Sequence, residues 1–359
     1  MKYRYWLSRL KGVSGPKKIK LTEQYKSAEA IYYIEETELK KCEILTDENI
    51  KALYDDKKST DIDKIYDEFK SKGIRLITYD MKEYPSRLKN IPDPPYALYV
   101  KGNMPDENKK SAAIVGARMC SNYGETYALK YGEFLAGCDV QVISGLANGI
   151  DGFGHRGCLN GGGRTFAVVG GGPDVCYPKK NEGLYNDILS HGGGIISEYL
   201  PGTAPVPRNF PARNRIISGL SDVVFVMEAK IRSGSLITAD MALEQGKDVY
   251  ALPGNVDNAI SEGCNRLIYQ GAGILLSEKQ LTEELGYLST KLGEKTVKNE
   301  KCLENEEKLL YSRLTLYPKC ISCLIEETGI EADIAVRSLV SLQIKGLIKE
   351  SSRNYYVRT

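Results

Sequence analysis

Short apolar runs recur along the middle of the chain, and a stretch with helical spacing separates each run from the next. The runs are SAAIVG at 111–116, DVQVIS at 139–144, RTFAVVG at 164–170, GGIISE at 193–198, DVVFVME at 222–228 and DVYALP at 248–253, and GILLS at 273–277 would add an edge strand. Runs of this length are typical of buried parallel strands, and their alternation with helices is typical of a doubly wound sheet. The pattern therefore predicts an open, Rossmann-like α/β domain over residues 104–285.

The two ends of the chain have a different pattern. Residues 1–103 are rich in Lys, Glu and Tyr, and apolar residues recur at helical spacing in YWLSRLKGV, SAEAIYYI and TDENIKALY. This pattern predicts a small helical region that ends near the polar stretch MPDENKK. Residues 286–305 are charged and weakly apolar, which indicates a linker. Three short helical stretches followed by the strand-like RNYYVRT predict a winged helix-turn-helix over residues 306–359.

The composition of the chain excludes some classes of protein but does not indicate one particular function. The chain has 359 residues, of which 42% are hydrophobic, enough to bury more than one core. Its 49 Lys and Arg against 47 Asp and Glu leave a net charge of +2, so any basic site must be local. The opening MKYRYWLSRLKG lacks the apolar core of a signal peptide, and no apolar stretch is long enough for a membrane span, so we expect a cytoplasmic protein. Nine cysteines without a framework predict free thiols.

The carboxyl ends of the predicted strands share glycines, small hydroxyl residues and basic residues. Ligands of open α/β sheets collect at these ends, where loops lead into helix N-termini. The loops concerned are Gly116–Arg118, Ser144–Asp151, Gly170–Asn181, Ser197–Arg215 and Glu228–Ser235. Glycines let the backbone approach an anion, helix N-termini offer uncommitted N–H donors, and Lys or Arg add charged hydrogen bonds. Five such loops at one edge predict a phosphate-binding site.

Several catalytic and cofactor classes are disfavoured by what these loops contain. No G-x-G-x-x-G follows the first predicted strand, which argues against a dinucleotide cofactor, and the sequence has no P-loop. Two histidines and a single C-x-x-C, at Cys320 and Cys323, argue against a zinc site. Asp151 and His155 stand one helical turn apart; they either form an acid–base pair or, as we favour, cap and pack a helix. The sequence thus predicts no catalytic residue, no cofactor and no metal.

The same loops carry a family resemblance. The segments concerned are AIVGAR, SNYG, VISGLANGIDGFGHRGCL, GGRTFAVVGGGPDVCYPKKN, ISEYLPGT, NFPARNRIISGLSDVVFVMEAKIRSGSLITADMALEQGKDVYALPG and EGCNRLIYQGA. With these motifs in this order, the chain resembles the DNA-processing protein A family, DprA, also called Smf. The resemblance implies a SAM-like helical domain, an extended Rossmann-like domain and a winged-helix domain. It also implies sequence-independent binding of single-stranded DNA, a homodimer through the Rossmann-like domain, and loading of the RecA recombinase during natural transformation.

The resemblance also implies a set of DNA-binding residues, position by position. They are Arg118 after the first strand, Ser144 and Gly145 after the second, Lys179 and Asn181 after the third, Arg213, Asn214 and Arg215 before the fifth, and Lys230, Ser233, Gly234 and Ser235 after it. The chain departs from the family at two positions: the family commonly has a basic residue in place of Asn148, and Ser or Thr in place of Ala117. Each departure is expected to weaken one phosphate contact.

Two alternatives remain open at this point. Arg213 and Arg215 are expected to face the phosphodiester backbone, unless one of them pairs with Glu198 or Glu228 and braces the loops. The main alternative function is a nucleotide or nucleoside-phosphate hydrolase on the same sheet. Related phosphoribohydrolases carry a P-G-G-x-G-T loop with a catalytic glutamate, an arrangement that VGGGPD and LPGNVD lack. A nucleotide-sensing regulator that reads duplex DNA is a weaker alternative. We therefore expect a binding protein that is not an enzyme and that does not associate with membranes.

Overall fold

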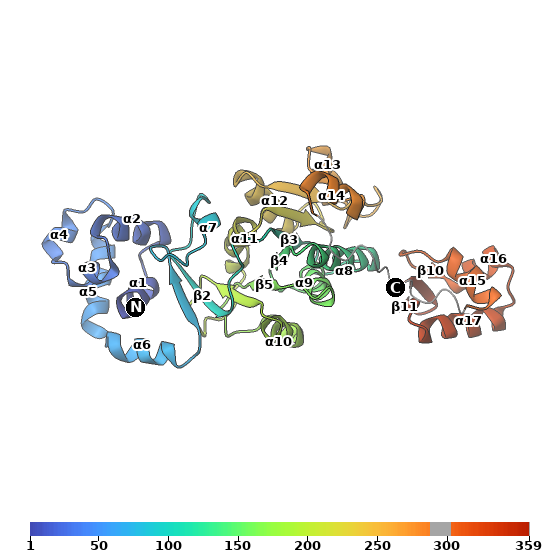
Figure 1. The fold of residues 1–359 in the computed structure, drawn as a ribbon, viewed down its shortest axis with the longest axis horizontal. Coiled ribbons are helices and arrows are strands. Elements are labelled where there is room, and N and C mark those ends of the chain that lie inside the picture. Colours follow the sequence, from blue (N-terminus) through green and yellow to red (C-terminus); the bar gives the residue numbers. More distant parts are fainter. Residues whose placement is uncertain (288–302, 359) are drawn as a thin grey trace.

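A nine-stranded, mostly parallel sheet forms the centre of the computed structural model, which describes residues 1–287 and 303–358 (Figure 1). The strand order is β1-β2-β6-β5-β4-β3-β7-β8-β9. The seven strands from β3 to β9 pair in parallel and are Ser111–Val115, Gln141–Ser144, Thr165–Val168, Gly194–Ser197, Val223–Val226, Asp248–Ala251 and Gly273–Ile274. Each lies within one of the seven apolar runs, so the predicted α/β fold is confirmed in this part of the chain.

The order of the strands creates a switch point between β3 and β7. From β3 the chain adds β4, β5 and β6 in one direction, and it then returns to place β7 on the other side of β3. The loops that leave β3 and β7 therefore run to opposite faces of the sheet. Open α/β sheets bind their ligands in the crevice that this divergence produces.

Helices cover both faces of the sheet, as expected for strands that are apolar on both sides. Along β3, Ala113 and Val115 belong to one buried cluster, whereas Ala112 and Ile114 belong to another. The first face is covered by α11 (Asn209–Leu220), α12 (Gly234–Glu244) and α13 (Glu262–Tyr269). The opposite face is covered by α8 (Asn122–Gly137), α9 (Ile150–Asn160), α10 (Glu182–Ser190) and α14 (Glu278–Leu285).

The helical cluster of the N-terminal region ends at residue 70, and residues 75–102 form two strands with only the short helix α7 (Ser86–Lys89) between them, which corrects the expectation of a helical region over residues 1–103. Its helices are α1 Lys2–Arg9, α2 Gly15–Tyr25, α3 Ala28–Tyr33, α4 Glu36–Lys40, α5 Asp47–Ser59 and α6 Ile62–Lys70. They enclose a buried cluster that includes Trp6, Leu21 and Leu53. After them, β1 (Arg75–Thr78) and β2 (Ala97–Gly102) pair with each other, and β2 pairs antiparallel with β6. The sheet therefore begins at residue 75. The apolar pattern of these two short segments does not distinguish a helix from a strand, and they become strands because β1 pairs with β2 and β2 pairs with β6.

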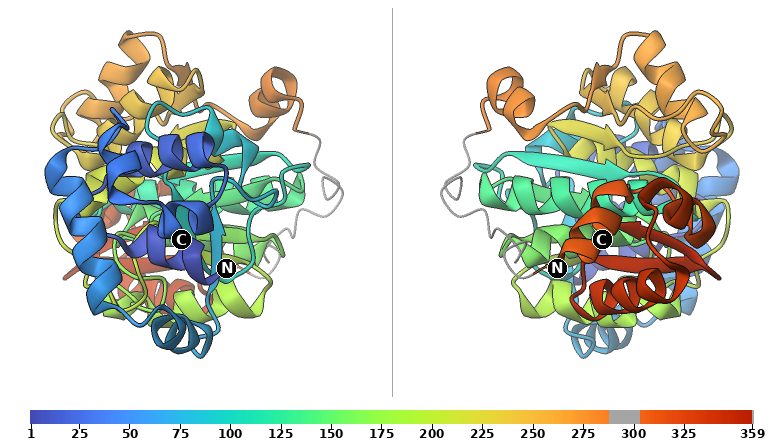
Figure 2. Two further views of the ribbon diagram at one scale, coloured as in Figure 1. Left: turned by 90° about the vertical axis from the view of Figure 1, so that its left-hand side faces the viewer. Right: turned by 90° about the vertical axis from the view of Figure 1, so that its right-hand side faces the viewer.

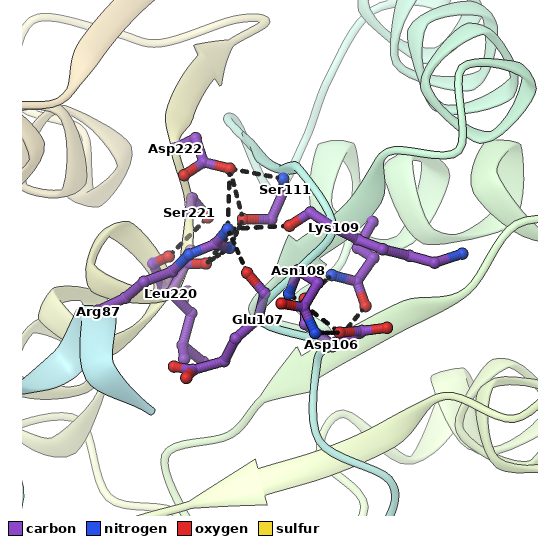
Figure 3. A network of polar contacts seen from close by, with 11 residues as sticks. Arg87, Asp106, Glu107, Asn108, Lys109, Ser111, Leu220, Ser221 and Asp222 are labelled. Atoms are coloured by element: carbon purple, nitrogen blue, oxygen red, sulfur yellow. Dashed lines mark hydrogen bonds and ion pairs between the residues drawn. The ribbon is translucent and has the colours of Figure 1, made fainter. Parts of the chain in front are cut away.

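A polar network fastens this added segment to the sheet (Figure 3). Arg87 lies in the short helix α7 (Ser86–Lys89) and donates to Ser111 Oγ at 2.6 Å and to the Lys109 carbonyl oxygen at 2.9 Å. Its guanidinium also lies 3.3 Å from the carboxylate of Asp222. Arg87 thus joins the segment between β1 and β2 to the starts of β3 and β7.

The C-terminal residues form a separate cluster of three helices and a small antiparallel sheet. The helices are α15 Asn305–Arg313, α16 Ile321–Thr328 and α17 Ala332–Ile344, and the strands are β10 Lys319–Cys320, β11 Ile348–Ser352 and β12 Tyr355–Arg358. Figure 2 shows this part and the N-terminal helices on opposite sides of the large sheet. Two contacts join it to α8: Lys349 binds Glu125 at 2.9 Å, and the rings of Tyr317 and Tyr123 stack 5.6 Å apart.

Some expectations concern residues outside the described ranges, and others concern residues within them. Most of the predicted linker, residues 288–302, lies outside the part of the chain that the structure describes. Eight cysteines fall in the described ranges, and all eight are free thiols. No helix within those ranges is both long and apolar enough to span a membrane.

Candidate functional site

A cavity of about 390 Å³ lies at the carboxyl ends of β3 and β7, at the switch point of the sheet. The segments that follow β3, β4, β5, β6 and β7 all contribute to its wall, as do the N-terminal parts of α9, α11 and α12. The lining residues are Val115, Gly116, Arg118, Ala147, Asp151, Tyr177, Pro207, Phe210, Pro211, Arg213, Asn214, Ile217, Ser233, Gly234, Ser235 and Thr238. The structure thus brings together loops that the sequence analysis placed at one edge from their composition alone.

Arg118 is the cation most exposed to this cavity. It follows β3, and its guanidinium carbon lies 5.3 Å from the centre of the Phe210 ring. The loop that carries it passes directly over Gly149, so a side chain at position 149 would collide with the backbone of Ala117 and Arg118. Gly149 also has φ +73°, a conformation that favours glycine. The loops after β3 and β4 are therefore held against each other, with Arg118 facing outward.

Two aromatic residues that the sequence analysis did not select complete the outer wall. Tyr177 and Phe210 are stacked, with ring centres 5.8 Å apart, and Tyr177 is 49% exposed. Their position next to Lys179, Arg208 and Arg213 in the sequence was the available signal, because aromatic residues among cations are typical of strand-binding grooves. Exposed rings beside a cation offer a stacking surface for a flat ligand.

The N-terminus of α12 also lines the cavity. Ser233 is its N-cap, and the Ser233 hydroxyl oxygen accepts a hydrogen bond from the Ser235 N–H at 3.3 Å. Gly234 begins the helix and is exposed, and the first N–H groups of a helix lack partners within it. Asn214, from α11, donates to the Gly234 carbonyl oxygen at 3.2 Å. These residues lie together as predicted, around a helix end suited to an anion.

Arg213 is buried and holds the floor of the cavity together. Only 4% of the residue is exposed, and its Nη1 donates to the carbonyl oxygen of Gly145, at 2.9 Å, and to that of Val168. The Asp151 carboxylate accepts from the Gly145 N–H at 3.0 Å. Burial lowers the pKa of Arg213 to about 10 and raises the pKa of Asp151, and the charge of each partner opposes these shifts. Arg213 therefore joins the ends of β4 and β5 while its side chain still lines the cavity.

Arg215 lies outside the cavity and forms a brace. Its guanidinium donates to both carboxylate oxygens of Glu198, and its Nε donates to the Asp93 carbonyl oxygen at 2.8 Å. Residues two apart on a helix point about 160° away from each other, so Arg215 does not line the cavity that Arg213 lines. The bracing alternative was therefore the right one for Arg215. Glu228 instead accepts hydrogen bonds from Ser121 at the start of α8.

The remaining predicted residues divide into structural and exposed ones. Ser144 is fully buried and donates to the Ile114 carbonyl oxygen at 2.6 Å, and Asn181 donates to the carbonyl oxygens of Leu146 and Ala147. Both side chains hold the β4 loop and lie outside the cavity. Lys179 and Lys230 are exposed and lie in the segments after β5 and β7, which also contribute Tyr177 and Ser233 to the lining of the cavity.

Asp151 and His155 do not act on a common partner. His155 is fully buried, and its Nδ1–H donates to Thr165 Oγ1 at 2.6 Å, since the Thr165 hydroxyl itself donates to Val142. Burial lowers the pKa of His155 to about 3, which leaves the ring neutral.

Cys320 caps α16 by accepting from the Cys323 N–H at 3.2 Å. Within the described ranges, no group of three or more His, Cys, Asp or Glu side chains is arranged to hold a metal ion.

Fold and cavity together define an α/β protein with a cationic, aromatic ligand site at its switch point. A family model for DNA recombination-mediator protein A matches residues 75–286, a range that starts where β1 starts. The Smf protein of Synechocystis sp. is 38% identical over 79% of this chain and 72% of its own length, and DprA of Streptococcus pneumoniae is 43% identical over 57% and 72%. This chain therefore belongs to the family of DNA recombination-mediator protein A.

Solved structures of related proteins share the fold. DprA from S. pneumoniae superposes with a TM-score of 0.69 at 34% identity, covering 79% of this chain and 98% of the other. DNA processing protein A from Helicobacter pylori, studied for its single-stranded DNA binding mode, gives a TM-score of 0.54 at 27% identity, covering 60% and 98%. The similarity to both structures extends to nearly all of each of those chains.

Proposed function

We propose that this protein binds single-stranded DNA without sequence preference in the cavity between β3 and β7, and that it has no catalytic activity. The observation that carries the proposal is the convergence of three features on one cavity: the exposed guanidinium of Arg118, the stacked Tyr177 and Phe210, and the N-terminus of α12. Cations and a helix N-terminus bind phosphates, and aromatic rings stack on bases of any sequence.

The residues of the proposed site contribute in different ways. Arg118, Lys179 and Lys230 supply mobile charge at the surface, and Ser233, Gly234 and Ser235 supply N–H and hydroxyl donors. Asn214 and Arg213 line the floor, where Gly145 contributes its backbone. Ser144, Asn181 and Arg215 support the loops from behind. The DNA processing protein of H. pylori, a member of the same family, has a described single-stranded DNA binding mode, which supports this choice of ligand.

The proposal extends to the wider role of the chain. The family description, a recombination mediator, supports transfer of the bound strand to the RecA recombinase during natural transformation.

We place the protein in the cytoplasm as a homodimer formed through the Rossmann-like domain. Large apolar side chains at the β9 end of the sheet support such a contact, since Tyr269 is 91% and Leu276 66% exposed. We assign residues 1–74 as a SAM-like domain, 75–287 as the Rossmann-like domain and 303–358 as a winged helix.

Fluorescence anisotropy separates this function from its alternatives. The full chain is titrated with a labelled dT oligomer, the matching duplex and free nucleotides, each at two salt concentrations. We expect tight, salt-dependent binding of the single strand, weaker binding of the duplex, and neither binding nor turnover of nucleotides. Turnover of a nucleotide would establish the hydrolase instead, and tight binding of one particular duplex would establish the regulator.

A further inference from the structure

Two cysteines stand at the beginning of α16, in the C-terminal part of the chain and outside the cavity described above. Cys320 is the N-cap of this helix and Cys323 is its third residue, so the two form a C-x-x-C pair across the first turn. Cys320 is half-buried and Cys323 is exposed, whereas Cys42, Cys158 and Cys264 are buried. Cysteine pairs with this spacing at a helix N-terminus are typical of redox-active dithiols.

The sulfur of Cys320 lies against Cys323. It accepts a hydrogen bond from the Cys323 backbone N–H at 3.2 Å, and the Cys323 thiol also donates to it. Cα atoms three residues apart in a helical turn are about 5 Å from each other, which is within the range that disulfides span. The two thiols are therefore placed to form a bond with each other without a large movement of the backbone.

The backbone on both sides of the pair is held in place. Cys320 ends β10, where it lies opposite Tyr355 of β12. Leu324, the residue that follows Cys323, is fully buried in the core of the C-terminal cluster. Because the fold already fixes the two positions, closing a disulfide between them costs little conformational entropy.

The helix makes the two thiols unequal. Hydrogen bonds from the thiol and the backbone N–H of Cys323 lower the pKa of Cys320, and the N-terminus of a helix also favours a thiolate. The contact between the thiols raises the pKa of Cys323, and the charges of Glu326 and Glu327 add to this effect. Burial raises the pKa of Cys158 to about 12, which leaves that thiol inert. Cys320 is thus suited to attack a disulfide, and Cys323 is suited to keep its proton until a second step.

We propose that Cys320 and Cys323 form a reversible dithiol–disulfide pair that exchanges with small disulfides such as oxidised glutathione. The Cys320 thiolate attacks one sulfur of the small disulfide, forms a mixed disulfide and releases a thiolate, which takes up the proton that Cys320 had lost. Cys323 then attacks the Cys320 sulfur, and its proton passes to the second small thiol as that thiol leaves. Two protein thiols are oxidised to one disulfide, and one small disulfide is reduced to two thiols. This site is separate from the proposed DNA site and does not depend on it.

The test equilibrates the full chain in buffers with different ratios of reduced to oxidised glutathione. After acid quenching and alkylation of the remaining thiols, tryptic peptides are identified by mass spectrometry, because residues 320–337 form one tryptic peptide with no other cysteine. We expect the ratio of disulfide to dithiol in this peptide to change tenfold for each tenfold change in the squared reduced concentration divided by the oxidised concentration, since both glutathione molecules have left. Excess dithiothreitol should restore the dithiol, and Cys158 should stay a thiol throughout.

Serine variants assign the two steps. Cys323→Ser lacks the thiol for the second step, so it should accumulate the mixed disulfide between Cys320 and glutathione. Cys320→Ser retains a good N-cap, and its remaining Cys323 should form a mixed disulfide several-fold more slowly. Cys176→Ser is the control: it changes a half-buried thiol elsewhere in the chain, so the pair should respond to glutathione as in the parent.

Three results would overturn the proposal. The first is a peptide 320–337 that stays a dithiol in every buffer, and the second is a parent protein that stops at a mixed disulfide with glutathione. The third is oxidation of Cys176 as readily as the pair. Equal rates of mixed-disulfide formation in the two serine variants would overturn the assignment of Cys320 as the attacking thiol. The measurement on the parent protein decides the main question even if neither variant folds.

Discussion

Arg215 donates hydrogen bonds to both carboxylate oxygens of Glu198, at 2.8 Å and 2.6 Å, and the two side chains are 13% and 17% exposed. The pair fastens α11 to the end of β6, and Asp93, from the segment between β1 and β2, joins it on the other side. Arg213, two residues earlier, faces the cavity. One short motif therefore supplies an arginine that lines the cavity and an arginine that braces the loops.

Replacing Arg215 should reduce stability and leave the remaining DNA affinity almost unchanged. Arg215→Ala leaves Glu198 largely buried and unpaired, which costs up to about 3–5 kcal/mol. Thermal unfolding should show a lower melting temperature, while the salt dependence of binding by the folded protein should match the parent. The double variant Arg215→Leu with Glu198→Leu is the control and should recover part of the lost stability. A lower salt slope for Arg215→Ala would instead make Arg215 a phosphate ligand.

Replacing an exposed cation of the site should reduce the affinity for DNA and leave the stability of the fold unchanged. Arg118→Ala, Lys179→Ala or Lys230→Ala each removes one ionic contact with the strand, so the slope of log affinity against log salt should fall by about 0.7. We expect a loss of roughly tenfold in affinity for each variant, equal for all base sequences, with an unchanged melting temperature. Lys20→Ala, an exposed cation on the N-terminal helices, is the matched control. A triple variant that still binds oligo-dT like the parent would contradict the assignment of the site.

Replacing the aromatic residues should weaken binding without changing its salt dependence. Loss of a ring that stacks on a base removes about 1–3 kcal/mol of binding free energy, and stacking releases no counterions. Tyr177→Ala is the cleaner variant because Tyr177 is half exposed, and Tyr177→Phe should bind like the parent. Equal affinities of the Ala variant and the parent for oligo-dT, measured by anisotropy, would remove Tyr177 from the site.

His155 should make folding stability depend on pH between about 6.5 and 3. Burial lowers its pKa to about 3, so in this window the unfolded chain binds a proton that the folded chain does not. The stability that this difference provides is fully present above pH 6.5 and falls by up to about 1.4 kcal/mol per pH unit as the pH decreases. Chemical unfolding of His155→Gln at several pH values should show a flatter dependence than the parent.

The Rossmann-like domain should require residues 75–103 to fold. A fragment of residues 104–287 lacks β2, which pairs with β6, and loses buried Leu88, Ile91, Leu98 and Val100 from the core. Burial of four such side chains contributes more than about 5 kcal/mol, a large part of the stability of a typical domain. Circular dichroism melts should show a cooperative transition for residues 75–287 and none for 104–287. Similar melting of the two fragments would place the boundary where the sequence pattern put it.

The local pattern of apolar and polar residues was sufficient to predict the strands that lie between helices. From β3 to β9 each strand is an apolar run bounded by polar turns, and the loops that follow these strands carry the residues of the site, including Arg118 and Ser233. The carboxyl ends of parallel strands meet at one edge of a sheet, so residue type and order along the chain alone predict where a ligand binds.

Tertiary structure alone decided the direction in which each side chain faces and which short segments become strands. The sequence placed Arg213 and Arg215 together, but helical geometry separates them, and Ser144 is a loop residue by pattern yet is buried against Ile114. β1 is a strand because it pairs with β2, and β2 in turn pairs with β6, which lies about ninety residues further along the chain. The aromatic wall of Tyr177 and Phe210 likewise exists only once distant loops pack together. Residue type sets the chemistry available at a sheet edge, whereas packing sets which atoms a ligand can reach.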